Sequence, residues 1–234
     1  MPRACVSARS TPLLRGRPRT FAGVFAAVVM LLMTSPTAAA DVPPVSPQAQ
    51  AAGLVDVRTV VPDARIDLRY ATTNNFVGVE LYPADARCLI HESMAPGLAT
   101  AADILRKHNA RLVFWDCYRP HDVQVRMFQE VPNPNWVARP TEFARSHEAG
   151  RSVDVTLADA HYGWLIDMGT DFDDFTPRSL AYATEGVTAT QQANRSKLRA
   201  AMEAGGLTVY SGEWWHFDGP EAGVGRPILD VPVN

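Results

Sequence analysis

The segment SHEAGRSVDVTL, residues 146–157, places a histidine, a glycine and a strand pattern in close succession. Gly150 has no Cβ and permits a tight turn soon after His147. The residues after the turn favour a strand, and alternate side chains of a strand share one face. Asp154 therefore shares its face with Ser152. We expect a loop histidine and a strand aspartate to lie on either side of one turn.

Strands and helices mix irregularly through the rest of the chain. Residues 93–108 carry apolar side chains at helical spacing, and residues 190–204 do the same before a pair of glycines. The order lacks the regular βαβ alternation of a doubly wound sheet, so we expect an α+β fold. Further predictions are strands at 65–70, 111–116 and 152–157, a short helix from residue 121, loops at 131–146 and 158–189, and a strand or two through Val209 and Trp215.

A second segment, EWWHF at residues 213–217, supplies another histidine. Together the two segments offer two imidazoles and one carboxylate, from His147, Asp154 and His216. Such a set suits Zn²⁺ and leaves a fourth position open. Because Glu213 would point away from His216 on a flat strand, we expect a bulge or turn near Gly212. That bend lets Glu213 reach a water without binding the metal, as a general base must.

The N-terminal residues have the pattern of a secretory signal peptide. Residues 1–20 hold five arginines and no acid, and residues 21–33 are an apolar run too short to span a bilayer comfortably. The following Ala38-x-Ala40 fits a signal-peptidase site. An uncleaved membrane anchor is the alternative. We expect three parts: a signal peptide at residues 1–40, a flexible leader at 41–52 and a single domain at 53–234.

The charge of the exported chain argues against one class of partner. Of 22 basic residues the five in residues 1–20 are lost, which leaves 17 against 25 acidic ones and a net charge near −8. Nucleic acids require a basic surface, so we expect no nucleic-acid partner. We also expect no stable membrane span after cleavage, and the sequence leaves the oligomeric state open. Cys88 and Cys117 could pair in an oxidising compartment, and the sequence leaves their state open as well.

Four short segments resemble the zinc D-alanyl-D-alanine dipeptidases of the VanX type. That family shares a superfamily with D,D-carboxypeptidases and the hedgehog signalling domain. The segments follow the family's order and spacing over nearly the whole exported chain. They are YATTNNF at 70–76, WDCYRP at 115–120, MGTDFD at 168–173 and EWWH at 213–216. The resemblance implies a central, mainly antiparallel sheet flanked by helices and one Zn²⁺ per chain.

The resemblance also implies the role of individual residues. The zinc ligands would be His147, Asp154 and His216, with Glu213 as the general acid and base. Arg119 corresponds to the arginine that stabilises the negative oxygen formed during attack on the peptide carbonyl, and Asp116 could orient it. Tyr70 and Asp173 match positions that hold the free amino group of the substrate, which selects short peptides.

Two positions depart from the common pattern of the superfamily. That pattern has serine two residues before the first histidine and alanine two residues before the aspartate. This chain has Arg145 and Ser152 there, with Ser146 next to the histidine. We expect Ser146 to contact the substrate, and Arg145 alters the contacts offered to the substrate's carboxylate. The exact dipeptide therefore stays open.

The resemblance implies zinc-dependent hydrolysis of a dipeptide, with D-Ala-D-Ala as the first choice, to free D-alanine. Export would place the enzyme in a periplasm or outside a bacterial cell, where wall-peptide turnover or nutrient scavenging fits better than glycopeptide resistance through destruction of the cytoplasmic dipeptide. Two alternatives remain: a D,D-carboxypeptidase that trims peptidoglycan stem peptides, and a non-catalytic zinc-containing binding module. Asp173 with Tyr70 argues against the first, and Glu213 with Arg119 argues against the second.

Overall fold

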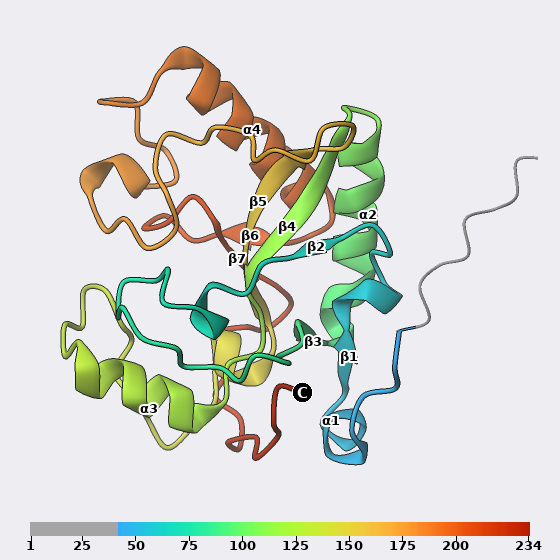
Figure 1. The fold of residues 1–234 in the computed structure, drawn as a ribbon, viewed down its shortest axis with the longest axis vertical. Helices are drawn as coiled ribbons and strands as arrows, with labels where there is room; N and C mark the ends of the chain where they lie inside the picture. Colours follow the sequence, from blue (N-terminus) through green and yellow to red (C-terminus); the bar gives the residue numbers. More distant parts are fainter. Residues whose placement is uncertain (1–41) are drawn as a thin grey trace, which may run out of the picture. The chain divides into compact units, whose positions relative to one another are not determined.

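Two antiparallel strands, β4 (Ala110–Asp116) and β5 (Ser152–Asp159), form the centre of a five-stranded sheet. The structure, a computed structural model, describes residues 42–234. The strand order is β2-β4-β5-β7-β6, with β2 at Arg65–Ile66, β7 at His216–Asp218 and β6 at Thr208–Val209. Only β2 runs parallel to its neighbour within this sheet. The prediction of an α+β fold with a mainly antiparallel sheet is confirmed (Figure 1).

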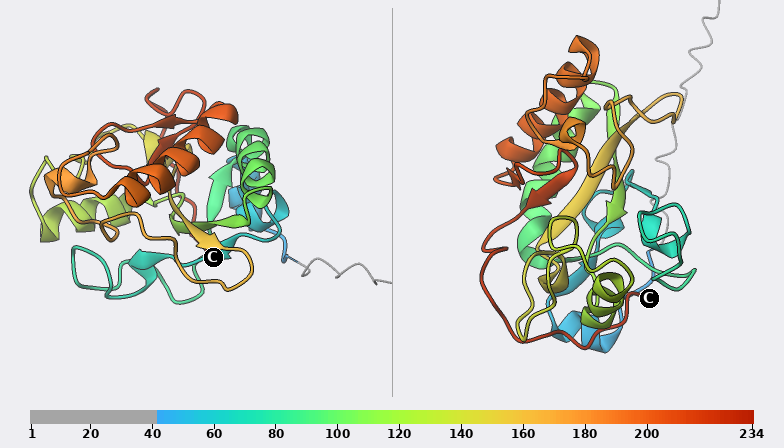
Figure 2. Two further views of the ribbon diagram at one scale, coloured as in Figure 1. Left: turned by 90° about the horizontal axis from the view of Figure 1, so that it is seen from above. Right: turned by 90° about the vertical axis from the view of Figure 1, so that its left-hand side faces the viewer.

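Two helices pack together on one side of the central strands. α2 (Ala95–Arg106) and α4 (Ala189–Ala204) lie against each other, as Figures 1 and 2 both show. Gly97 in α2 and Gly205 after α4 touch backbone to backbone, and a Cβ on either residue would collide with the other's carbonyl. The two long helices expected from the sequence are therefore present, and α2 starts two residues later than the predicted helix.

Shorter elements surround the opposite side and the end of the sheet. β1 and β3 pair in a separate two-stranded antiparallel sheet, and α3 is the short helix expected from residue 121. The remaining bounds are α1 Pro47–Ala51, β1 Leu54–Asp56, η1 Val57–Thr59, η2 Arg69–Ala71, β3 Leu89–His91, η3 Glu92–Met94, α3 His121–Glu130, η4 Ser146–Ala149 and η5 Pro177–Ser179.

The strand predicted at residues 65–70 is shorter than expected. It ends at Ile66, and the chain turns into a 3-10 helix at Arg69–Ala71. The side chain of Asn75 donates to the carbonyl oxygens of Thr72 (2.7 Å) and Val79 (2.9 Å), which folds the following loop back on itself. Alternation of polar and apolar residues does not distinguish a strand from this 3-10 turn, so the prediction extended the strand too far.

Part of the segment predicted as a flexible leader is folded. Ser46 caps the short helix α1, and Ala49 within it is fully buried. The fold therefore starts before residue 53. The predicted signal peptide at residues 1–40 lies outside the described residues. Within residues 42–234, no helix has the length and apolar character needed to cross a membrane.

A disulfide joins the start of β3 to the end of β4. Cys88, just before β3, is bonded to Cys117, just after β4, with their Cα atoms 5.2 Å apart. Both cysteines are almost fully buried. The pairing that the sequence left open is therefore present in the structure.

Candidate active site

Three potential metal ligands converge at the end of the central strands. The β5–β7 register places Asp154 directly opposite His216. The left-handed Gly150 ends the η4 turn and brings His147 back beside them. His147 Nε2 lies 3.1 Å from His216 Nδ1 and 3.4 Å from Asp154 Oδ1, and His216 Nδ1 lies 3.1 Å from the same oxygen. The structure thus brings together the trio that the two sequence segments predicted.

The chemistry of the three donor atoms fits a divalent cation. His147 Nδ1 is 2.8 Å from the carbonyl oxygen of Cys117, and His216 Nε2 is 3.0 Å from Asp218 Oδ1, so each neutral ring would donate outward. The inward nitrogens then present lone pairs to each other and to Asp154 Oδ1, a buried oxygen with no hydrogen-bond partner. Tetrahedral zinc bonds would hold such donors about 3.3 Å apart. The observed spacings match that requirement.

The pKa shifts within the trio also favour a bound cation. Burial disfavours the charged form of His216, yet the nearby carboxylates of Asp154 and Asp218 raise its pKa to about 10. The pKa of Asp154 is lowered because the attraction of His147 and His216 outweighs the cost of burial. A positive charge is therefore favoured among these side chains, and a metal ion would supply it in place of a proton.

Glu213 lies beside the trio in the loop between β6 and β7. The chain turns at residues 211–212, and the Glu213 amide donates to the Tyr210 carbonyl oxygen at 3.2 Å. This is the bend predicted near Gly212. Glu213 Oε2 is 4.0 Å from His216 Nδ1, and its carboxylate is not one of the three converging ligands. Burial and the nearby Asp154 raise the pKa of Glu213, which suits a group that accepts and returns a proton.

Arg119 is held rigidly by side chains from two elements. Its guanidinium donates to Asp116 Oδ2 at 2.6 and 3.0 Å and to Gln124 Oε1 at 2.8 Å. Asp116 is fully buried and also accepts the hydroxyl of Tyr82 at 2.6 Å. The Arg119 guanidinium lies over the ring of Tyr70 at 5.2 Å. Sequence reasoning considered Asp116 and missed Gln124 and Tyr82, because nothing in their spacing links them to the arginine.

Asp173 and Tyr70 form a second acidic corner of the site. The Tyr70 hydroxyl lies 3.3 and 3.2 Å from the two carboxylate oxygens of Asp173, and the Phe76 amide donates to Oδ2 at 3.4 Å. Asp173 has a positive φ of 59°, an uncommon backbone state outside glycine. Burial, Asp154 and Glu213 together raise its pKa well above the ordinary value. A cationic group placed here would stabilise the ionised carboxylate of Asp173, which burial and the neighbouring carboxylates otherwise disfavour.

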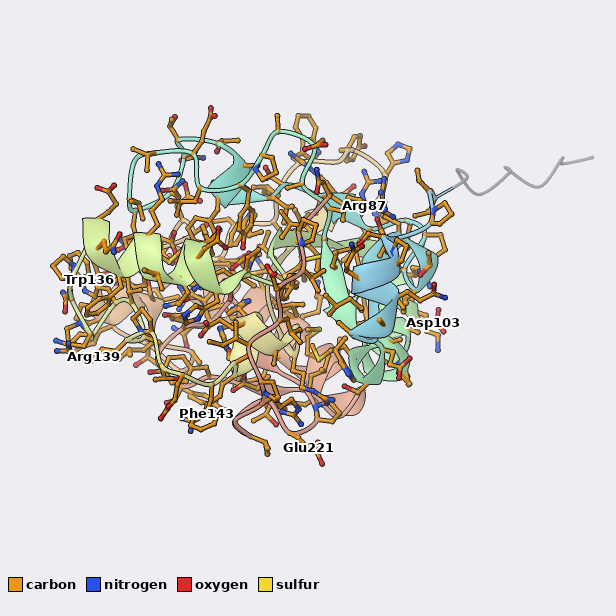
Figure 3. The ribbon with its side chains drawn as sticks, turned by 90° about the horizontal axis from the view of Figure 1, so that it is seen from below. Arg87, Asp103, Trp136, Arg139, Phe143 and Glu221 are labelled. Carbon is orange, nitrogen blue, oxygen red and sulfur yellow. A yellow bond between two sulfur atoms is a disulfide. The ribbon has the colours of Figure 1, made fainter. Side chains whose placement is uncertain are left out.

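A single cavity of about 440 Å³ contains these groups. Its outer wall includes Trp136, Arg139 and Phe143 from the loop after α3, and Figure 3 shows these three along the side where that helix lies. Arg145 also lines the cavity. All eight residues singled out from the sequence line it: Tyr70, Arg119, Ser146, His147, Asp154, Asp173, Glu213 and His216. The hydroxyl of Ser146 donates to Ser152 at 2.8 Å, and its contact with substrate stays a prediction.

Known proteins resemble this chain over most of its length. A sequence model of the M15 peptidase family, described as D-ala-D-ala dipeptidase, matches residues 50–234. A D-alanyl-D-alanine dipeptidase from Escherichia coli (strain K12) is 39% identical over 176 residues, which are 75% of this chain and 89% of that protein. One from Enterococcus faecium is 30% identical over 207 residues, 78% and 98% of the two chains. The solved structure of the LdcB LD-carboxypeptidase is 20% identical, covers 56% of this chain and 59% of its own, and has a TM-score of 0.37.

Proposed function

The chain belongs to the M15 family of D-Ala-D-Ala dipeptidases, and we propose that it hydrolyses D-Ala-D-Ala to free D-alanine in a zinc-dependent reaction. The observation that carries the proposal is the content of one cavity. It holds a trio of metal-ligand type, a separate carboxylate beside the trio, a fixed guanidinium and an acidic corner. Hydrolysis of a short peptide with a free amino group uses each of these four parts.

The metal would be held by His147 Nε2, Asp154 Oδ1 and His216 Nδ1, one ion per chain. The M15 family is zinc-dependent in general, and the donor set and its spacing support zinc here. Zinc, when bound, acts as a Lewis acid that polarises the peptide carbonyl and makes water more acidic.

Glu213 would carry the proton through the reaction. Its carboxylate takes a proton from the attacking water and then gives it to the nitrogen of the leaving amino acid. Its raised pKa, caused first by burial, supports the second half of this cycle because it makes the protonated carboxyl easier to form.

Arg119 would stabilise the oxygen that becomes negative as the carbonyl is attacked. The bonds to Asp116 and Gln124 fix its guanidinium before substrate arrives, so little reorganisation is needed in the transition state. This rigidity supports a role in catalysis over a role as a mobile surface charge.

Asp173 and Tyr70 would bind the ammonium group of the substrate. A positive ammonium compensates the buried carboxylate whose pKa is raised in the free protein. A long stem peptide has an amide at that position, so this corner favours a dipeptidase over a D,D-carboxypeptidase. Arg145 and Ser146 line the same cavity and are candidates for contacts with the rest of the substrate.

We further propose that residues 1–40 are an export signal and that the mature enzyme, a single catalytic domain, works in a periplasm or outside the cell. The arginine-rich start, the apolar run and the Ala38-x-Ala40 site support the signal. The Cys88–Cys117 disulfide supports an oxidising compartment. Turnover of wall peptides is the role that fits this location.

An amine-release assay tests the proposal. The panel contains D-Ala-D-Ala, other D,D-, L,D- and L,L-dipeptides, and a stem pentapeptide ending in D-Ala-D-Ala, each with and without a chelator. We expect chelator-sensitive release from D-Ala-D-Ala and little from the pentapeptide. Faster release from the pentapeptide would indicate a carboxypeptidase. Zinc binding without hydrolysis of any peptide would indicate a binding module.

A further inference from the structure

A chain of hydrogen bonds leads from the η4 turn to the outer nitrogen of His216. Ser146 Oγ donates to Ser152 Oγ at 2.8 Å, and Ser152 Oγ donates to Asp218 Oδ1 at 2.5 Å. The same carboxylate oxygen lies 3.0 Å from His216 Nε2. Two serines that no step of the reaction uses are thus connected to a candidate metal ligand.

The register of two strands creates this arrangement. Along the β5–β7 pair, Ser152 lies opposite Asp218 and Asp154 lies opposite His216. Residues two apart on a strand point to the same side, so the two cross-strand pairs stack on one face. Asp154 and His216 are two of the candidate ligands. The neighbouring pair, Ser152 and Asp218, places a hydroxyl and a carboxylate next to the outer nitrogen of His216.

The two members of the outer pair differ in exposure. Ser152 is fully buried, whereas the side chain of Asp218 is 40% exposed. An exposed carboxylate can rotate away from its histidine and bond to water. The buried Ser152 hydroxyl holds one carboxylate oxygen at the position where it meets Nε2 of His216.

We propose that Ser152 is a positioning residue that acts through Asp218 to fix the His216 ring for metal binding. The inference rests on the proposed zinc site at His147, Asp154 and His216. A carboxylate behind a ligating imidazole sets its tautomer and orientation, and its loss typically weakens metal affinity. Ser152 is one of the two positions at which this chain departs from the common superfamily pattern.

Zinc affinity, measured by competition with a chromophoric chelator, tests the inference independently of turnover. The proteins are wild type, Ser152→Ala, Asp218→Ala and the double variant. We expect Asp218→Ala to weaken zinc binding roughly 10- to 100-fold. We expect Ser152→Ala to weaken it about 2- to 10-fold, the effect of one hydrogen bond. Because Ser152 acts through Asp218, adding Ser152→Ala to Asp218→Ala should cause no further loss.

A hydroxyl elsewhere on the same strand provides the control. Thr156→Val removes a buried hydroxyl from β5 that has no bond to Asp218, and we expect zinc affinity to stay unchanged. Equal losses for Ser152→Ala in both backgrounds would overturn the inference, because the serine would then act on the fold alone. Unchanged affinity in Ser152→Ala would overturn it as well. A wild-type protein that binds no zinc would instead contradict the proposed function itself.

Discussion

Two halves of the cavity are held in place by different means. In the sheet half, Asp154 and His216 face each other because β5 and β7 pair in register. In the loop half, side-chain contacts place the groups: Arg119 is held by Gln124, five residues further along the chain, and Asp173 is held by Tyr70, 103 residues away. The sheet half presents lone pairs that require a cation, whereas Arg119 in the loop half already has its counter-charge in Asp116. Two of the three candidate metal ligands are thus placed by strand pairing, whereas the proposed oxyanion-stabilising arginine and the proposed ammonium-binding carboxylate are placed by side-chain contacts.

The strongest test of this division is the proton carrier of the sheet half. We expect Glu213→Gln to lower kcat by roughly 10²- to 10⁴-fold, because general acid–base catalysis contributes about that much. Zinc content should stay the same, since Glu213 is not one of the three ligands. Steady-state kinetics and metal analysis of the purified variant measure the two effects. Glu148→Gln, in the same cavity but paired with His121, is the matched control. Retained turnover in Glu213→Gln would exclude the assigned role.

Arg119 tests whether the loop half also takes part in the chemical step. We expect Arg119→Lys to lower kcat by roughly 10²- to 10³-fold with little change in KM, because the oxyanion exists only in the transition state. Lysine keeps a positive charge near Asp116 but loses the two-pronged contact. Arg139→Lys, in the same cavity wall, should change kcat little. A rise in KM alone would place Arg119 among the substrate-binding groups instead.

Asp173 tests selection for a free amino group. We expect Asp173→Asn to lower kcat/KM for D-Ala-D-Ala roughly 10- to 100-fold, the value of one charged hydrogen bond. N-acetyl-D-Ala-D-Ala, which has no ammonium, serves as the comparison substrate. The wild type should prefer the free dipeptide strongly, and the variant should lose most of that preference. A variant that keeps the full preference would show that the amino group binds elsewhere.

Asp173→Asn, which should lower activity, should also raise the stability of the folded protein at neutral pH, and this effect should be the smaller of the two. Burial raises the pKa of Asp173 in the folded protein, so the folded state holds this proton more tightly than the unfolded state. Stability is therefore lost as the pH rises from about 3.9 towards the raised value. We expect Asp173→Asn to have a higher Tm at pH 7, by roughly 2–4 °C for each kcal/mol recovered, and the same Tm as wild type near pH 3. Thermal unfolding at the two pH values checks this; a lower Tm at pH 7 would contradict it.

The sheet half was largely predictable from the sequence. The turn at Gly150, the strand containing Asp154 and the bend before His216 follow from local patterns, and the structure contains all three. Periodicity and spacing suffice there because each feature depends on residues close in the chain. The α+β class was also predictable, since the order of elements excluded a regular βαβ repeat.

The loop half depended on family resemblance and contained contacts that no local pattern reveals. Gln124 reaches Arg119 from the start of α3, five residues along the chain, and nothing in the sequence pattern marks this pair. Asp218 was missed behind His216, although the two residues are separated by one position, because its role requires a partner on β5. The prediction of a strand to residue 70 failed as well, because the chain enters a 3-10 helix at Arg69–Ala71 that the alternation of polar and apolar residues does not reveal.

The carbonyl oxygen that orients His147 belongs to Cys117, and Cys117 is cross-linked to Cys88. The bond closes residues 88–117 into a covalent ring whose closing point is next to Asp116. A ring of this size removes freedom from the unfolded chain worth roughly 3–4 kcal/mol in the chain-entropy view. Maturation of the enzyme therefore includes an oxidation. The oxidation that closes the ring also fixes the carbonyl oxygen behind His147, so formation of the disulfide affects the geometry of the proposed metal site.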